Sequence, residues 1–91
     1  MNVNAKITVK GIVQGVGYRW YADRTARKYN VKGYVENFPD TSVFLEVEGE
    51  QALIEELVQE LRKGPRAASV EDIIVEWGSA HNLFIGFKIK A

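Results

Sequence analysis

Apolar and polar residues alternate along two stretches of the chain. Ala5, Ile7 and Val9 recur at every second position, and Val43–Gly49 shows the same alternation. A period of two is typical of a strand with one buried and one solvated face. We therefore predict that the first strand ends near Ile12 and that a later strand, the third in chain order, covers Val43–Gly49. Further apolar runs predict strands over three more ranges, Val31–Asn37, Val70–Trp77 and Phe84–Lys90.

Two other stretches repeat with the period of a helix. Between Arg19 and Asn30, small or apolar residues recur at spacings of three and four, namely Ala22, Thr25, Ala26 and Tyr29. A second apolar stripe consists of Leu53, Ile54, Leu57, Val58 and Leu61. Basic residues and then Gly64 and Pro65 follow this stripe, as is usual where a helix ends. We predict two helices, each with one buried face.

The order of these elements predicts the fold. A strand, a helix, two strands, a second helix and two more strands form the ferredoxin-like split βαβ plan of the α+β class. This plan is one antiparallel sheet of four to five strands, with both helices on one face. The 91 residues contain no linker-like stretch and are 46% hydrophobic, so we expect a single domain over residues 1–91.

Composition and charge exclude several classes of function. Twelve basic residues balance twelve acidic ones, so no overall positive field favours nucleic acid or an anionic membrane. The chain has no cysteine, and His81 is its single histidine, which excludes thiolate chemistry and any site with two imidazoles. The first residues resemble neither a secretory signal nor a membrane span, so we expect a cytoplasmic protein.

Candidate chemistry lies where the first strand meets the first helix. In a split βαβ unit the first and second strands are parallel, so the loop VQGVGYR at 13–19 and Asn37 lie at the same edge of the sheet. Backbone N–H groups of a glycine-containing loop at a helix N-terminus bind anions. The planar fork of Arg19 suits two phosphate oxygens. The amide of Asn37 can hold a water molecule but cannot act as a base.

Each of these residues also fits an ordinary structural role. The glycines fit a simple turn, the arginine a solvated helix surface and the asparagine a turn residue, so their convergence at one edge is what favours a site. His81 is interpreted as a solvated loop residue, and Glu46 and Glu48 as part of a solvated sheet face. Trp20 fits either the rim of the site or partial burial against a neighbouring loop.

The segment KGIVQGVGYRWYADRTARKYNVKGYVENFPDTSV resembles the signature region of the acylphosphatase family, in which a G-x-VQGVGFR loop precedes a G-[WY]-V-x-N-x-x-DG-x-V strand and turn. VEGE, KGP and FKI extend the resemblance over nearly the whole chain. It implies a ferredoxin-like hydrolase that cleaves the carboxyl-phosphate anhydride of acyl phosphates to a carboxylate and inorganic phosphate. It also implies a monomer that needs no cofactor or metal.

The resemblance further implies the site residues. Arg19 and Asn37 are the expected catalytic residues, and the expected phosphate-binding loop is Gln14, Gly15, Val16, Gly17, Tyr18 and Arg19. The chain departs from the family pattern at three positions, with Tyr18 for phenylalanine, Glu36 where a basic residue is common and Thr41 for a turn glycine. Glu36 is expected to point away from Asn37, and Thr41 suggests a different turn type.

Two non-catalytic alternatives stay open at this point. VKGYVENF partly matches the RNP1 pattern of RNA-binding ferredoxin-like sheets, although Val35 and Glu36 stand in place of its small and aromatic residues. The other alternative is a regulatory module of the same fold that binds a small anion.

Overall fold

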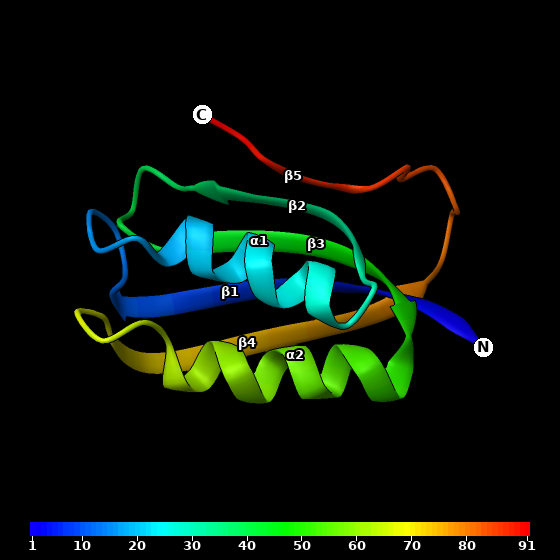
Figure 1. Cartoon of the computed structure of the whole chain (residues 1–91), viewed down its shortest axis with the longest axis horizontal. Helices are drawn as coiled ribbons and strands as arrows, with labels where there is room; N and C mark the ends of the chain where they lie inside the picture. Colours follow the sequence, from blue (N-terminus) through cyan, green and yellow to red (C-terminus); the bar gives the residue numbers. More distant parts are fainter.

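Five strands and two helices follow one another in the predicted order in a computed structural model that describes residues 1–91 (Figure 1). The elements are β1 (Asn2–Ile12), α1 (Tyr18–Lys28), β2 (Lys32–Asn37), β3 (Val43–Glu50), α2 (Gln51–Lys63), β4 (Ser69–Ser79) and β5 (Phe87–Ile89). They form one sheet with the strand order β4-β1-β3-β2-β5. None of the helices is long and apolar enough to cross a membrane.

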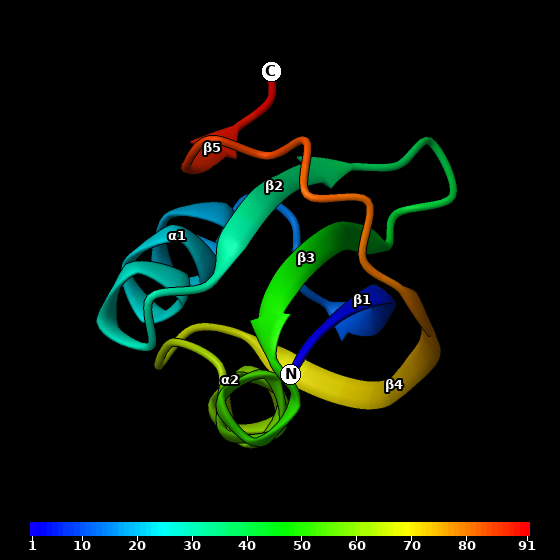
Figure 2. The ribbon, with the colours of Figure 1, turned by 90° about the vertical axis from the view of Figure 1, so that its right-hand side faces the viewer.

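The hydrophobic core lies between the sheet and the two helices, which cover the same face of the sheet (Figure 2). The alternating residues of the strands point into this layer, with Ala5, Ile7, Val9, Val43, Leu45 and Val47 fully buried. The helices contribute the predicted stripes, of which Ala22, Ala26, Ile54, Leu57 and Leu61 are fully buried. Leu53 is an exception, because it is 36% exposed at the edge of its stripe. The ferredoxin-like arrangement is therefore confirmed.

The last strand differs from the prediction in length and direction. Only Phe87–Ile89 is strand, and β5 pairs parallel to β2, so the sheet is mixed and not wholly antiparallel. The direction of β5 follows from the point at which the chain crosses the sheet. β4 ends with Ser79 beside Val3, at the end of the sheet where β2 begins. A chain that crosses to the start of β2 can pair with it only by running in the same direction.

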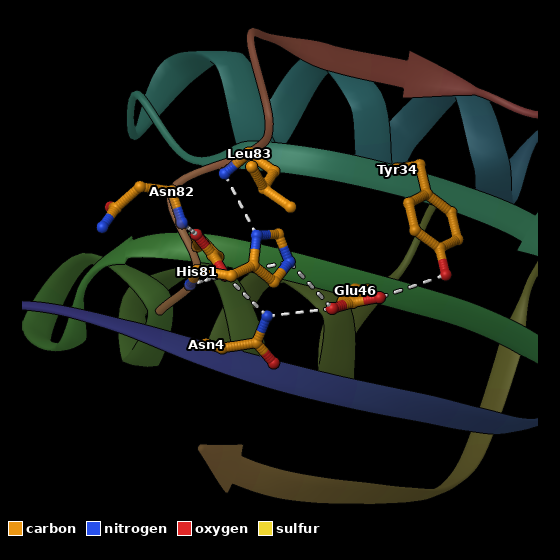
Figure 3. A network of polar contacts seen from close by, with 7 residues as sticks. Asn4, Tyr34, Glu46, His81, Asn82 and Leu83 are labelled. Carbon is orange, nitrogen blue, oxygen red and sulfur yellow. Dashed lines mark hydrogen bonds and ion pairs between the residues drawn. The ribbon is translucent and has the colours of Figure 1, made fainter. Parts of the chain in front are cut away.

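The connection from β4 to β5 crosses the face of the sheet opposite the helices (orange in Figure 2). A polar network fixes it there (Figure 3). The backbone N–H groups of His81 and Asn82 each donate to the carboxylate of Glu48 at 2.9 Å. The side chain of Asn4 donates to Glu46 and Glu48, also at 2.9 Å. His81 Nε2 lies 3.2 Å from Glu48 and 3.5 Å from Glu46.

This network corrects the interpretation of Glu48 as a solvated residue. Glu48 is only 4% exposed, because the 80–86 connection covers this part of the sheet. Burial by itself raises the pKa of Glu48, but the hydrogen bonds from His81, Asn4 and Asn82 outweigh it and lower the pKa below its ordinary value. The carboxylate thus attaches the connection to the sheet, and His81 contributes to the same contact.

Candidate active site

A cavity of about 190 Å³ lies where β1 and β2 end, beside the start of α1. β1 and β2 both run antiparallel to β3, so their carboxyl ends lie at one end of the sheet, on the left in Figure 1. The cavity is lined by Val13, Gly15, Gly17, Tyr18, Arg19, Trp20, Asn37 and Ile89. The predicted convergence of the loop, Arg19 and Asn37 is therefore present. Gln14 and Val16 do not line the cavity.

The loop before α1 has a conformation that depends on its glycines. Gly15 and Gly17 have φ angles of 75° and 78°, in the left-handed region that L-residues rarely adopt. A Cβ atom would meet nothing within 4 Å at either position, so the backbone conformation and not space favours glycine. Gly17 is the N-cap of α1 and no side chain caps this helix end. The backbone N–H groups of residues 15–20 make no hydrogen bond within the chain and remain available.

Arg19 lies in the first turn of α1, and the residue that follows β5 holds its guanidinium. Its Nη1 donates to the carbonyl oxygen of Lys90 at 2.9 Å. No carboxylate pairs with Arg19, in contrast to Arg27, which lies 3.1 Å from Asp23. A guanidinium has five N–H donors, so most of them are free for a ligand. Arg19 therefore supplies an oriented positive charge that no acidic residue neutralises.

Asn37 is the last residue of β2 and carries an unsatisfied polar atom. Its Oδ1 is buried and accepts no hydrogen bond from any group of the chain. A buried acceptor without a donor is rare in folded proteins, so this oxygen is available to a water molecule or a ligand in the cavity. Glu36, the neighbouring residue, lies on the opposite face of the strand by the alternation that buries Val35 in the core. The carboxylate of Glu36 thus points away from the side chain of Asn37, as expected.

Two residues of the predicted loop have structural contacts. The Gln14 side chain donates to the carbonyl oxygens of Phe38 and Ser42, both at 2.8 Å, and so joins the loop to the β2–β3 turn. Tyr18 is 1% exposed, and its hydroxyl donates to the carbonyl oxygen of Leu61 at 2.7 Å. Burial raises the pKa of Tyr18 well above its ordinary value. Neither side chain is arranged as a proton acceptor for chemistry in the cavity.

The β2–β3 turn accommodates the departure at Thr41. Its φ of 75° lies in the left-handed region that favours glycine. Asp40 Oδ1 accepts hydrogen bonds from the backbone N–H and hydroxyl of Ser42, at 3.1 and 2.6 Å. Threonine thus occupies a backbone conformation suited to glycine.

Three cavity residues lie outside the predicted set. Val13 and Trp20 flank the loop, and the position of Trp20 off the buried stripe of α1 was a signal for the rim. Ile89 comes from β5, whose parallel pairing with β2 brings it to the cavity. The apolar alternation of the predicted last strand does not indicate this location, because the direction of β5 depends on the path of the 80–86 connection.

Comparisons with known proteins agree with this geometry. The acylphosphatase family profile matches residues 5–89. An acylphosphatase of Salinibacter ruber is 44% identical over 88 residues, which are 97% of this chain and 90% of that protein. An acylphosphatase of Thermotoga maritima is 48% identical over 71 residues, 78% of this chain and 79% of that protein. The crystal structure of acylphosphatase from Bacillus subtilis superposes with a TM-score of 0.94 at 29% identity and covers 98% of this chain and 99% of that one.

These similarities extend over the loop, both helices and all five strands. They favour an enzyme over the non-catalytic RNA- or anion-binding module. Because the family profile and the relatives match most of its length, the chain belongs to the acylphosphatase family and is an enzyme that hydrolyses acyl phosphates.

Proposed function

We propose that the loop N–H groups and Arg19 hold the phosphoryl group of an acyl phosphate while Asn37 orients the attacking water. The observation that carries this proposal is the presence, in one cavity, of an arginine without an acidic partner and an asparagine whose buried oxygen lacks a donor. The first would be neutralised by a phosphoryl group. The second would be satisfied by a water molecule, which donates to Oδ1 and is thereby oriented.

The phosphoryl site draws on two kinds of donor. The N–H groups of residues 15–20 lie around the start of α1, where the helix dipole also favours a negative charge. Arg19 adds a planar fork that can donate to two phosphoryl oxygens at once. The contact with the Lys90 carbonyl restricts the guanidinium before substrate binds. Such preorganised donors stabilise the charge that the transition state spreads over the equatorial oxygens.

The reaction is a single displacement at phosphorus. The water oxygen forms a bond to phosphorus while the bond from phosphorus to the carboxylate oxygen breaks, which yields a carboxylate and inorganic phosphate. Carboxylates are weak bases, with pKa values of about 4, so this leaving group needs no general acid. We infer that the proton of the water passes to a phosphoryl oxygen of the substrate. Tyr18 does not take it, since its hydroxyl is bonded to Leu61 and the pKa of Tyr18 is raised.

We also propose that the reaction is independent of metal ions, because residues of the chain can stabilise the negative charge on the phosphoryl oxygens. Arg19 and the loop N–H groups supply positive potential that a divalent cation supplies in other phosphoryl-transfer enzymes. Phosphate monoesters should be poor substrates, because an alkoxide leaving group needs an acid and none lies in the cavity. We also propose that the enzyme acts as a cytoplasmic monomer, which size-exclusion chromatography with light scattering would test for the oligomeric state.

The test compares Arg19→Lys and Arg19→Ala with the parent on an acyl phosphate, in excess chelator. Both variants should lose activity to a similar extent, because a point charge cannot reproduce the bidentate contact. Inorganic phosphate should raise the Tm of the parent and of neither variant. Arg62→Lys on the exposed face of α2 is the matched control and should behave as the parent. Loss of parental activity in chelator, or a parental phosphate shift in Arg19→Lys, would contradict the proposal.

A further inference from the structure

The cavity that contains Arg19 and Asn37 has an apolar rim. Trp20 is 64% exposed, Ile89 is 40% exposed, and both line the cavity. Trp20 lies outside the buried face of α1, so the core does not account for its position. A large indole is thus held in solvent next to the polar groups of the site, where it is available to a ligand.

The indole of Trp20 is itself held in place. The guanidinium carbon of Arg24, one helical turn further along α1, lies 5.4 Å from the centroid of the Trp20 ring. This cation–π contact restricts the side chain although most of its surface is exposed. A restricted side chain loses less conformational freedom when a ligand packs against it, so the arrangement favours binding.

The lining of the cavity places the acyl part of the substrate at this rim. In the proposed function the phosphoryl group and the attacking water occupy the polar part of the cavity, beside Arg19 and Asn37. The other large side chains of the lining, those of Val13 and Tyr18, are buried in the core. The acyl group therefore extends from the polar groups toward the open mouth, where Trp20 and Ile89 are exposed.

We propose that Trp20, with Ile89 beside it, is the acyl-group subsite and determines a preference for large apolar, above all aromatic, acyl groups. This inference rests on the proposed function of the cavity. An aromatic acyl group stacks on the indole or packs edge-to-face against it, whereas an acetyl group is too small to cover the ring. The contact lies away from the reacting bond and is the same in the ground state and in the transition state. It therefore acts on KM and leaves kcat unchanged.

The test measures steady-state hydrolysis of benzoyl phosphate and acetyl phosphate by the parent, Trp20→Ala and Trp20→Phe. Trp20→Ala should raise the KM for benzoyl phosphate about tenfold, the order of effect of one aromatic contact, with kcat nearly unchanged. The KM for acetyl phosphate should change less than about twofold, since acetyl covers little of the ring. Trp20→Phe should recover most of the benzoyl affinity. Trp77→Ala is the matched control, because Trp77 is 44% exposed on β4 and does not line the cavity.

The outcomes separate the subsite from the function on which it rests. Equal KM changes for the two substrates in Trp20→Ala, or none for benzoyl phosphate, would overturn the subsite while the parent remains active. Failure of the parent to hydrolyse either acyl phosphate would overturn the proposed function as well.

A binding measurement tests the same contact without turnover. In Trp77→Phe, Trp20 is the sole tryptophan, so its fluorescence reports on the rim alone. Benzylphosphonate, which has an aromatic group and no hydrolysable bond, should change this fluorescence more than methylphosphonate does at equal saturation. Identical responses to the two phosphonates would show that the aromatic group does not reach the indole and would overturn the proposal.

Discussion

Replacement of Asn37 by alanine should separate stability from catalysis. No group of the chain donates to the buried Oδ1 of Asn37, so alanine breaks no hydrogen bond between this oxygen and another residue. The substitution removes the packing of the amide and the water that the proposed mechanism places on Oδ1. We therefore expect the stability of Asn37→Ala to lie within about 1 kcal/mol of that of the parent. For a domain of this size that corresponds to a Tm within roughly 4–8 °C of the parental value.

The same substitution should abolish most of the turnover. Positioning a nucleophile accounts for several kcal/mol of an activation barrier, so we expect kcat to fall about a hundredfold or more, equivalent to about 2.7 kcal/mol. KM and the phosphate-induced rise in Tm should stay near the parental values, because Arg19 and the loop remain. Asn37→Asp adds a negative charge beside the phosphoryl oxygens and should also weaken phosphate binding.

The assay combines thermal unfolding, with and without inorganic phosphate, and steady-state hydrolysis of an acyl phosphate. Asn2→Ala, at the exposed start of β1, is the matched control for loss of an asparagine side chain. Near-parental kcat in folded Asn37→Ala would refute the water-positioning role. A Tm more than roughly 8 °C below that of the parent would contradict the argument that Oδ1 has no partner within the chain, and would make Asn37 a structural residue.

Two further predictions concern stability away from the cavity. Thr41→Gly should stabilise the fold by roughly 0.5–1 kcal/mol, because left-handed φ costs threonine more than ordering the chain costs glycine. Thermal unfolding measures the gain, and Thr41→Ala, which keeps the strain, should not show it. Glu48→Gln should lower Tm at neutral pH but lose that difference in acid, because the folded pKa of Glu48 lies below its ordinary value of 4.5. The stabilisation by the Glu48 carboxylate is full above pH 4.5 and is lost as the pH falls through the lowered pKa. A Tm difference between parent and variant that stays constant from pH 7 to 3 would contradict this prediction. An equal effect of the control Glu56→Gln, on the exposed face of α2, would also contradict it.

The location of the site could be predicted from the order of the elements. A strand, a helix and a second parallel strand with a third between them leave two loop regions at the same end of the sheet, whatever the side chains are. The residue types at that end, glycines before a helix and an amide after a strand, then indicated an anion site. Both steps depend on local patterns and on one general topology, and for that reason they did not require the structure.

The burial of Glu48 could not be predicted in the same way. Alternation along β3 identifies the face on which Glu46 and Glu48 lie, but not whether another segment covers that face. The covering segment, residues 80–86, is irregular and has no periodic pattern. Its path is fixed by hydrogen bonds from two backbone N–H groups to Glu48, and backbone donors have no signature in the sequence. The interpretation of Glu48 as part of a solvated face was therefore wrong, because a tertiary contact determines its burial.

The orientation of Arg19 depends on a main-chain contact of the same kind. The acceptor for its guanidinium is the carbonyl oxygen of Lys90, so the side chain at position 90 does not encode the contact. The backbone N–H of Lys90 in turn donates to the carbonyl oxygen of Val35 on β2, at 2.9 Å. Arg19 is thus positioned through the pairing of β5 with β2. That pairing begins at Phe87, directly after the 80–86 connection whose residues His81 and Asn82 are bonded to Glu48. The network on the far face of the sheet and the arginine in the cavity therefore depend on the same C-terminal segment.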